Sequence, residues 1–351
     1  MSLHRLIRAA RSIALLLLSC VAFSASAQTS ACPPDAQKVI IYHAGSLTAA
    51  FSQVEALFTQ QTGICVVDVA AGSVDAARRV TAGQEPCDIY ASADDKDIDV
   101  FLKPAGFADF NIAFARGAMV LAYSTNSRGA STIVAPNAAF TPPTTIPTAA
   151  DNWATQLTQP GVIIAGSNPF LDPSGYRSDM IFQLAEQRYR IPSLYNTLLS
   201  HYTLTRGSDV IGTNFDYQFT YEHSALAAYN RAPATYRYAH LPEDLGLSNS
   251  DLNRFYDNVG VVMPGLHTAH SPSAVRVPGS RVTWGLTILK QAPNRANAIK
   301  FLQTLFGSQG VALQAAVGPE PISPPRVSYS DWHDVPPVLR PYVRPEHLDH
   351  H

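Results

Sequence analysis

Two segments of the chain share one pattern, Lys38-Val-Ile-Ile-Tyr-His-Ala-Gly-Ser46 and Ile64-Cys-Val-Val-Asp-Val-Ala-Ala-Gly-Ser73. Each is a short β-rich run that ends in a turn with a Gly-Ser pair, and each is followed by a helical pattern. Apolar residues from Leu47 to Phe58 recur at helical spacing, and Gly63 is expected to end that helix. This repetition of strand, turn and helix predicts parallel strands with right-handed crossovers. The sequence therefore indicates an α/β fold with helices on both faces of a sheet.

Similar patterns continue along the chain. We expect further strands over 87–91, 162–165 and 282–289, and helices over 74–81, about 175–189, 294–306 and 308–317. The Thr-, Pro- and Ala-rich stretch from Ser131 to Ala150 has the composition of a linker or surface excursion. The residues from Pro319 onward are rich in Pro and His and are expected not to pack as a domain.

The N-terminus has the composition of a secretory signal peptide over residues 1–27. Arg5, Arg8 and Arg11 precede an apolar run from Ile13 to Phe23, and Ala25-Ser-Ala27 forms a small-residue cleavage site. The apolar run is shorter than the roughly 18 residues that a spanning helix needs. We therefore expect cleavage and a periplasmic protein.

A lipid anchor is the alternative to cleavage at Ala27. Leu17-Leu-Ser-Cys20 loosely matches a lipobox, which would leave a diacylated Cys20 at the N-terminus. The Leu18 that directly precedes Ser19 fits this motif poorly, and the downstream Ala-Ser-Ala site is the better match.

The charge of the mature chain is mildly acidic. Removing the three arginines of the signal segment from the 25 basic residues leaves 22 against 27 acidic residues, a formal charge of −5. Such a chain has no electrostatic footprint for nucleic acid or for anionic lipid. We expect a soluble protein outside the cytoplasm, without a nucleic-acid partner.

Three cysteines remain after cleavage: Cys32, Cys65 and Cys87. In an oxidising compartment an odd number implies one disulfide and one free thiol, but the sequence does not say which two pair. Three unpaired thiols are the alternative. No CxxC spacing or histidine cluster accompanies them, so a zinc site is not expected.

The Gly-Ser pairs Gly45-Ser46 and Gly72-Ser73 are candidate anion-binding turns. Where a strand ends and a helix starts, unpaired N–H groups face outward and a serine hydroxyl adds a donor. Serine is also a favoured helix N-cap, which is the simpler interpretation of either turn alone. Two such turns after neighbouring parallel strands favour a ligand site, because ligands bind at the carboxyl ends of the strands in open α/β sheets. His43 in the first turn is expected to be a structural, hydrogen-bonded residue.

Motifs of common enzymes are absent from the sequence. It contains no GxxxxGK[ST], GxGxxG, GxSxG or HExxH pattern. This argues against nucleotide, dinucleotide, serine-hydrolase and zinc-protease functions. A secreted enzyme stays the alternative from another class, for which no nucleophile with a base in reach is visible.

Six blocks of sequence between about residues 40 and 322 occur in the same order as in one known protein family. They are His43-Ala-Gly-Ser-Leu47, Ala70-Ala-Gly-Ser-Val74, Asp88-Ile-Tyr-Ala-Ser-Ala-Asp94, Phe114-Ala-Arg-Gly-Ala-Met-Val-Leu-Ala-Tyr123, Ser167-Asn-Pro with Asp172-Pro-Ser-Gly-Tyr-Arg177, and Trp284-Gly-Leu-Thr-Ile288. In these blocks the chain resembles the periplasmic or extracellular molybdate/tungstate-binding proteins of ABC importers, particularly the tungstate-binding branch.

The resemblance implies a two-lobed periplasmic-binding-protein fold of type II-like organisation. Each lobe would be a mainly parallel sheet flanked by helices, with the ligand in the interlobe cleft. The expected bounds are 28–118 plus about 291–322 for lobe 1, about 119–290 for lobe 2, and 323–351 for a Pro- and His-rich tail. It also implies a monomer without enzymatic activity or cofactor. This protein would capture tungstate or molybdate and deliver it to an ABC transporter permease. Another oxyanion or a metal chelate is the alternative ligand.

The resemblance also implies the ligand-binding residues. The serine hydroxyls and backbone amides of the two turns would hold the oxyanion, which assigns Gly45, Ser46, Gly72 and Ser73. In the tungstate-binding branch two carboxylates also approach the metal, and the aspartate corresponds to Asp172.

The second carboxylate is assigned to Glu222, and the competing alignment places Thr220 there instead. A Mo(VI) or W(VI) centre can accept carboxylate oxygens as additional ligands, whereas sulfate and phosphate cannot and would be repelled. Asp172 before Pro173 is equally suited to cap a helix.

Three further residues near Asp172 are expected to support the site without binding the metal: Ser174, Tyr176 and Arg177. Arg177 lies one turn into the expected helix. It is predicted to pair with an acidic residue such as Asp94 or Glu222.

Overall fold

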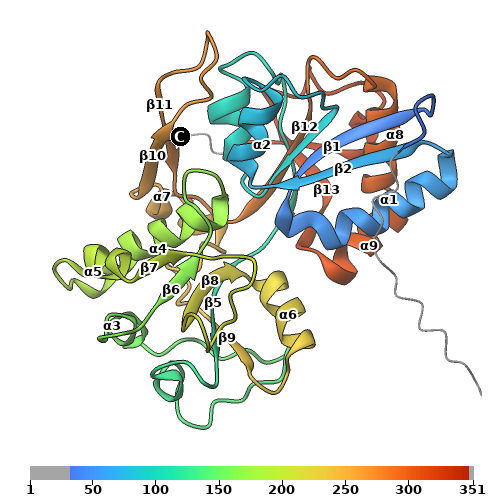
Figure 1. Cartoon of the computed structure of the whole chain (residues 1–351). Helices are drawn as coiled ribbons and strands as arrows, with labels where there is room; N and C mark the ends of the chain where they lie inside the picture. Colours follow the sequence, from blue (N-terminus) through green and yellow to red (C-terminus); the bar gives the residue numbers. More distant parts are fainter. Residues whose placement is uncertain (1–31, 348–351) are drawn as a thin grey trace, which may run out of the picture. The chain divides into compact units, whose positions relative to one another are not determined.

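The computed structural model describes residues 32–347. The expected signal peptide and the alternative lipid site at Cys20 lie outside the described residues. The described part contains one sheet of seven strands and one of five, each flanked by helices (Figure 1). The α/β fold that the sequence predicts is therefore present.

The seven-stranded sheet has the order β14-β13-β4-β12-β3-β1-β2. Its strands are β1 (Lys38–Ala44), β2 (Cys65–Ala71), β3 (Ile89–Ser92), β4 (Ile112–Arg116), β12 (Thr283–Ile288), β13 (Glu320–Ser328) and β14 (Arg344–Glu346). Its helices are α1 (Thr48–Thr62), α2 (Ser73–Val80), α8 (Arg295–Phe306) and α9 (Ser308–Val317). As the repeated pattern predicts, β1 runs parallel to both β2 and β3.

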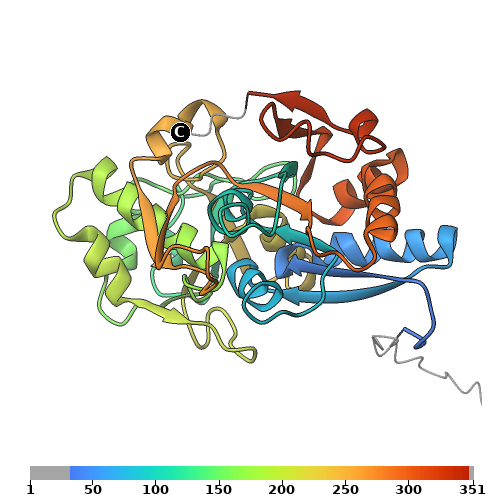
Figure 2. The ribbon, with the colours of Figure 1, turned by 90° about the horizontal axis from the view of Figure 1, so that it is seen from above.

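Helices cover both faces of this sheet around β1. Neighbouring side chains of a strand point to opposite faces. The ring of His43 accordingly lies 5.1 Å from that of Phe51 in α1, whereas Tyr42 lies beneath Arg79 of α2, also at 5.1 Å. On the His43 side, α1, α8 and α9 pack against one another (Figure 2). Gly63 ends α1 with a φ of 69°, as expected for a left-handed cap.

The five-stranded sheet has the order β7-β6-β8-β5-β9. Its strands are β5 (Met119–Ser124), β6 (Ile164–Gly166), β7 (Tyr202–Leu204), β8 (Tyr217–Tyr221) and β9 (Tyr236–His240). Its helices are α3 (Trp153–Leu157), α4 (Pro173–Tyr189), α5 (Leu194–Ser200) and α6 (Glu222–Arg231). After this sheet come α7 (Asn253–Tyr256) and an antiparallel pair formed by β10 (Gly260–Pro264) and β11 (Ala274–Pro278).

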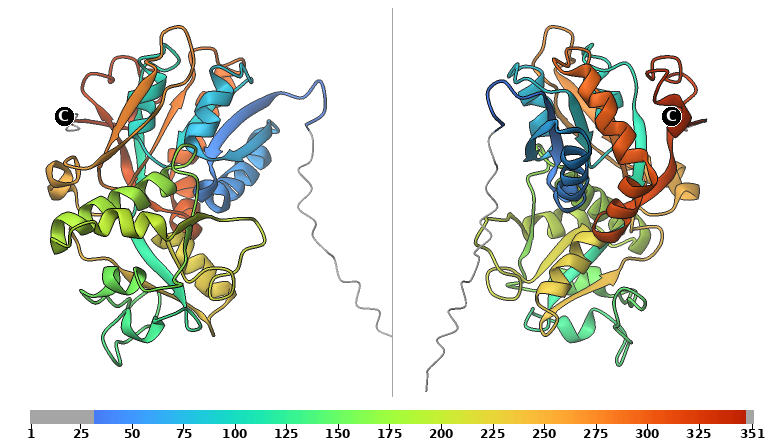
Figure 3. Two further views of the ribbon diagram at one scale, coloured as in Figure 1. Left: turned by 60° about the vertical axis from the view of Figure 1, so that its left-hand side comes forward. Right: turned by 90° about the vertical axis from the view of Figure 1, so that its right-hand side faces the viewer.

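Both sheets are mixed, so the expected mainly parallel order is wrong. In the first sheet β12 runs antiparallel to β3 and β4, and in the second β5 runs antiparallel to β8 and β9. The physical reason is the path of the chain. Strand β4 of the first sheet ends at Arg116, and β5 of the second sheet begins at Met119 (Figure 3). This connection between the two sheets therefore consists of two residues, Gly117 and Ala118. Strands next to such crossings do not belong to strand-helix-strand units, which are the source of parallel pairing.

The strand pairing also disagrees with the expected end of lobe 2 near residue 290. Strand β12 was assigned to the second lobe, but it lies between β3 and β4 in the seven-stranded sheet. Its residues are all buried, and such an apolar run does not reveal which of two sheets it joins.

The segment after residue 322 contributes to the first sheet. Strand β13 pairs with β4 and with β14, so the segment adds to an existing sheet. Its buried apolar residues are too widely spaced to show a helical or strand period: Val327, Val335, Leu339 and Val343.

Cys32 and Cys65 form the disulfide, and Cys87 is a buried free thiol. One bridge and one leftover thiol agree with the interpretation of the odd cysteine number. Over residues 32–347, no helix has both the length and the apolar character needed to cross a membrane.

Candidate functional site

The two Gly-Ser turns leave the sheet side by side. In the β1–β2 pair Ala44 is opposite Ala71, so the turns that follow begin at the same level of adjacent parallel strands. Gly45 and Ser46 start a short 3-10 turn that leads into α1. Gly72 is the N-cap of α2, and Ser73 is its first residue. The adjacency that the sequence predicts for these turns is therefore present.

The hydroxyl of Ser73 is fully buried and accepts a hydrogen bond from the backbone N–H of Ala93 at 3.0 Å. Its carbonyl oxygen accepts a second bond from the Tyr90 hydroxyl at 2.8 Å. A hydroxyl that accepts in this way still carries its own hydrogen. None of the hydrogen bonds within residues 32–347 uses that hydrogen, so Ser73 can donate it to an acceptor.

Ser46 is held in a similar way by a different residue. Its hydroxyl accepts from the indole N–H of Trp284 at 2.9 Å, and its carbonyl lies 3.0 Å from Nε2 of His223. Because a carbonyl only accepts, this contact requires a hydrogen on Nε2 of His223. Burial lowers the pKa of His223, which favours the neutral ring. The hydroxyl hydrogen of Ser46 is again unused by any bond of the described part of the chain.

Asp172 caps helix α4. Its Oδ1 accepts from the backbone N–H of Ser174 at 2.8 Å, and Pro173 occupies the first helical position. The capping interpretation is confirmed by this geometry. One carboxylate oxygen forms the cap, which leaves the second oxygen of Asp172 for another interaction. The Ser174 hydroxyl lies 2.9 Å from that of Ser167 and so supports the same turn.

Asp172 lies against the second Gly-Ser turn. The carbonyl of Leu171 accepts from the N–H groups of Val74 and Asp75, at 3.1 and 3.2 Å. A Cβ atom placed on Gly72 would come within 2.4 Å of that carbonyl oxygen and 3.3 Å of the Asp172 Cβ. The structure thus brings together Gly72 and Asp172, which are distant in the sequence, and it does so through a contact that only glycine permits.

Arg177 pairs with Asp94, as one of the two predicted alternatives states. The two side chains are each 1% exposed, and their nearest charged atoms are 3.2 Å apart. Arg177 also donates to the Ala93 carbonyl at 2.6 Å and to the Tyr221 hydroxyl at 3.0 Å. The single residue Ala93 therefore links Ser73, through its N–H, to Arg177, through its C=O.

Tyr176 strengthens this connection. Its hydroxyl lies 2.8 Å from an oxygen of Asp94 and 3.1 Å from one of Asp97. Burial and the neighbouring Asp94 raise the pKa of Asp97 well above its usual range. Tyr176 and Arg177 thus join α4 to the turn after β3.

Glu222 is paired with His240, whereas a role as second ligand would place it near Asp172. It is the first residue of α6, and its Oε1 lies 2.7 Å from Nε2 of His240. It lines a cavity of about 430 Å³ together with Arg116, His223 and Arg281. No hydrogen bond or ion pair between described residues connects it to Asp172. The competing Thr220 lies in β8 opposite Val120.

Sequence reasoning missed the residues that orient the two serines. Trp284 belongs to a quoted block but had no assigned role, and Ala93 acts through its backbone alone. An indole N–H in a fully buried strand needs an acceptor, and this requirement is the signal that points to Trp284.

The sequence matches the family model described as bacterial extracellular solute-binding protein over residues 39–318. The chain belongs to this family. An uncharacterized solute-binding protein of Petrotoga mobilis is 31% identical over 297 residues, which are 82% of this chain and 85% of the relative. The molybdate/tungstate-binding protein WtpA of Pyrococcus abyssi is 29% identical over 307 residues, covering 78% and 81% of the two chains.

Among solved structures, the sulfate-binding protein SubI of Mycobacterium tuberculosis H37Rv matches with a TM-score of 0.53. Its sequence is 18% identical, and the match covers 82% of this chain and 87% of SubI. This likeness shows the two-lobed fold of periplasmic binding proteins. As a member of the extracellular solute-binding family, the protein is a binding protein and not an enzyme.

Proposed function

We propose that this solute-binding protein captures molybdate or tungstate in the periplasm and delivers it to an ABC transporter permease. The observation that carries the proposal is the state of the two serine hydroxyls. Ser46 and Ser73 each accept a hydrogen bond from an N–H group, which fixes the oxygen and leaves the hydroxyl hydrogen for an outside acceptor. A tetrahedral oxyanion offers several acceptors that two such donors can share.

Asp172 gives the proposal its selectivity. The Cβ of Asp172 lies close to Gly72, and a second carboxylate oxygen directed into the site from there would repel sulfate or phosphate. A Mo(VI) or W(VI) centre accepts additional oxygen ligands, so the same carboxylate becomes a donor to the metal. Glu222 remains the proposed second donor. Its pairing with His240 means that it must leave that partner to reach the ligand.

The relatives support this choice of ligand. WtpA of Pyrococcus abyssi carries the name molybdate/tungstate-binding protein, and it shares four-fifths of its length with this chain. The proposed periplasmic location agrees with the family description and with the N-terminal signal pattern.

A ligand panel tests the function. Thermal unfolding of the mature protein is measured with molybdate, tungstate, sulfate and phosphate at equal concentrations. A ligand that binds the native state raises the melting temperature by mass action. We expect a rise with molybdate and tungstate and none with the other two. A rise with sulfate alone, or with none of the four, contradicts the proposal.

A matched pair of variants assigns the binding to the turns. Ser46→Ala removes one hydrogen bond to a charged ligand and should weaken tungstate binding by about ten- to a hundredfold, or roughly 1.5–3 kcal/mol. Ser52→Ala changes an exposed hydroxyl within α1 that bonds to Thr48, and should bind as the parent does. Isothermal titration of both variants separates the two. Equal affinities would reduce Ser46 to a structural role.

A further inference from the structure

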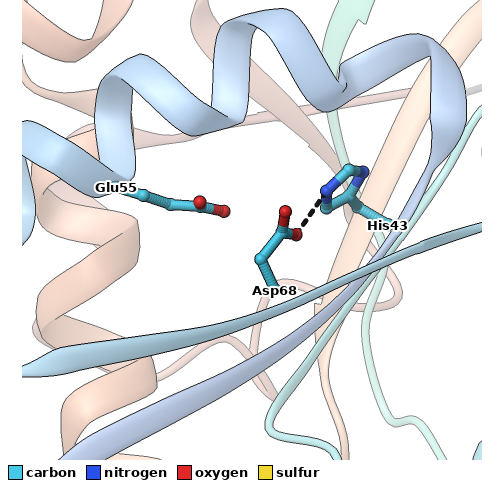
Figure 4. A group of neighbouring side chains, drawn as sticks. All are labelled: His43, Glu55 and Asp68. Carbon is cyan, nitrogen blue, oxygen red and sulfur yellow. Dashed lines mark ion pairs between the residues drawn. The ribbon is translucent and has the colours of Figure 1, made fainter. Parts of the chain in front are cut away.

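A second group of side chains lies near the first Gly-Ser turn, since His43 precedes Gly45 by two residues. His43 is in β1, Asp68 is in β2 and Glu55 is in α1 (Figure 4). Asp68 is opposite Ile41 in the β1–β2 pair, two residues from His43, so the strand alternation places both side chains on one face. Helix α1 covers that face and presents Glu55 to them.

The three side chains converge on one point. One ligand-type atom from each lies within 4.8 Å of the other two, and Nε2 of His43 is 2.5 Å from Oδ1 of Asp68. Figure 4 shows the Glu55 carboxylate directed toward this pair. The His43 side chain is completely buried, whereas that of Asp68 keeps 25% of its exposure.

Apart from the ion pair between His43 and Asp68, these three atoms have no partner among the described residues. They are the buried atoms Nε2 of His43, Oδ1 of Asp68 and Oε1 of Glu55. The other ring nitrogen of His43, Nδ1, lies 2.8 Å from the Ala44 carbonyl, and a carbonyl only accepts. Nδ1 therefore carries a hydrogen, and Nε2 faces Asp68. Against the opposing effect of burial, the Asp68 carboxylate holds the pKa of His43 above its usual value.

Two buried carboxylate oxygens that share one possible donor, Nε2 of His43, require an explanation, because buried polar groups are almost always satisfied. The Glu55 and Asp68 carboxylates also repel each other in a medium of low dielectric, and burial followed by the charge of Asp68 raises the pKa of Glu55 to about 7. A cation at that point removes both costs at once. We propose that His43, Glu55 and Asp68 bind a divalent transition-metal cation.

The donor set indicates the class of cation. One imidazole nitrogen with two carboxylate oxygens suits Zn²⁺ and similar borderline ions, whereas Ca²⁺ and Mg²⁺ prefer oxygen ligands alone. Zinc bonds to nitrogen and oxygen are about 2.0–2.2 Å long. The three atoms, which lie within 4.8 Å of one another, would have to rearrange around the ion to form such bonds. The Ala44 carbonyl fixes the tautomer of His43, as is usual for a metal-binding histidine.

The test is calorimetric titration with Zn²⁺ of the mature protein freed of metal with EDTA, with no oxyanion present. We expect the parent to bind one Zn²⁺ ion. Ca²⁺ or Mg²⁺ at about 1 mM, a concentration of physiological magnitude, should not displace it. Glu55→Gln, which preserves the size of the side chain, should weaken this binding at least tenfold. Asp109→Asn removes an exposed carboxylate that pairs with Lys290 and should leave it unchanged.

Cobalt provides a direct readout of the ligands. Co²⁺ in the site should give a visible absorption band in the parent and in Asp109→Asn, and that band should be lost in Glu55→Gln. Histidines near the chain end contribute the same background to every variant. The proposal is overturned if the parent binds no Zn²⁺, or if Glu55→Gln and Asp109→Asn bind it equally. Because no oxyanion is involved, neither result depends on the proposed transport function.

Discussion

At the scale of single residues, each of the two serine hydroxyls also satisfies a donor of a buried residue, Trp284 for Ser46 and Ala93 for Ser73. Removing the Ser73 hydroxyl leaves the N–H of Ala93 without its acceptor in a fully buried place. Ser73→Ala should therefore lower the free energy of unfolding by about 1–3 kcal/mol, in addition to weakening ligand binding. Urea unfolding without ligand measures the effect, with Ser52→Ala as control, and equal midpoints would contradict it.

Asp172 separates capping from coordination. Asparagine caps a helix about as well as aspartate, so Asp172→Asn should keep the stability of the ligand-free protein. If the free oxygen binds the metal, tungstate affinity should fall strongly in the same variant. Glu222→Gln should add to the loss, and the double variant should begin to accept sulfate because the repulsion is gone. Isothermal titration with both anions decides this, and unchanged tungstate binding in Asp172→Asn would leave the cap as its whole role.

Asp95 makes stability depend on pH. Its pKa is raised to about 7, mainly by burial. Among its charged neighbours, Lys96 and Arg177 lower the pKa, whereas Asp94 and Asp99 raise it. The folded state therefore binds more protons than the unfolded state between about pH 4 and pH 7. The stability contributed by the protonated group is present below pH 4 and is lost as pH rises to 7.

Asp95→Asn should remove this dependence. The free energy of unfolding of the parent should fall relative to that of the variant as pH rises from 4 to 7, and each unit of pKa displacement corresponds to about 1.4 kcal/mol. Urea unfolding in EDTA at several pH values gives both curves. Parallel curves for parent and variant would refute the assignment.

At the scale of elements, the start of α2 and the turn before α4 fit together at Gly72. A methyl group at Gly72 would come within 2.4 Å of the Leu171 carbonyl oxygen. It would disrupt the two hydrogen bonds that this oxygen accepts from the N–H groups of Val74 and Asp75. Gly72→Ala should therefore lower the free energy of unfolding and weaken tungstate binding. Gly207→Ala is the matched control, since its Cβ would have nothing within 4 Å and Gly207 is outside the proposed site. Thermal unfolding and titration of the pair test the contact, and similar behaviour of both variants would argue against it.

At the scale of the whole molecule, the local patterns could be predicted and the long-range pairings could not. The strand-turn-helix repeats predict β1, α1, β2 and α2 to within a few residues, because hydrophobic spacing and Gly-Ser turns act locally. Strand β12 has no such local signal for its sheet. It is buried throughout, and its place between β3 and β4 depends on residues about 170 or more positions away.

The same limit applies to the candidate site. The turns with Ser46 and Ser73 follow from the strand ends, and the pairing of Arg177 with Asp94 was one of two options from charge alone. The contact of Asp172 with Gly72 needed the structure, and so did the indole bond of Trp284. Glu222 shows the opposite case, since an alignment suggested its role and its actual neighbour is His240.

The position of β12 in the middle of the seven-stranded sheet has a consequence for the order of assembly. During synthesis, β3 and β4 have no shared neighbour until residue 288 has been made, and the edge strands β13 and β14 follow later still. All five strands of the other sheet lie between residues 119 and 240, so that sheet can close while the first is still incomplete. The N-terminal half of the chain thus emerges first but completes its sheet last. Its unpaired strand edges, which attract other chains, stay exposed until the C-terminal residues arrive.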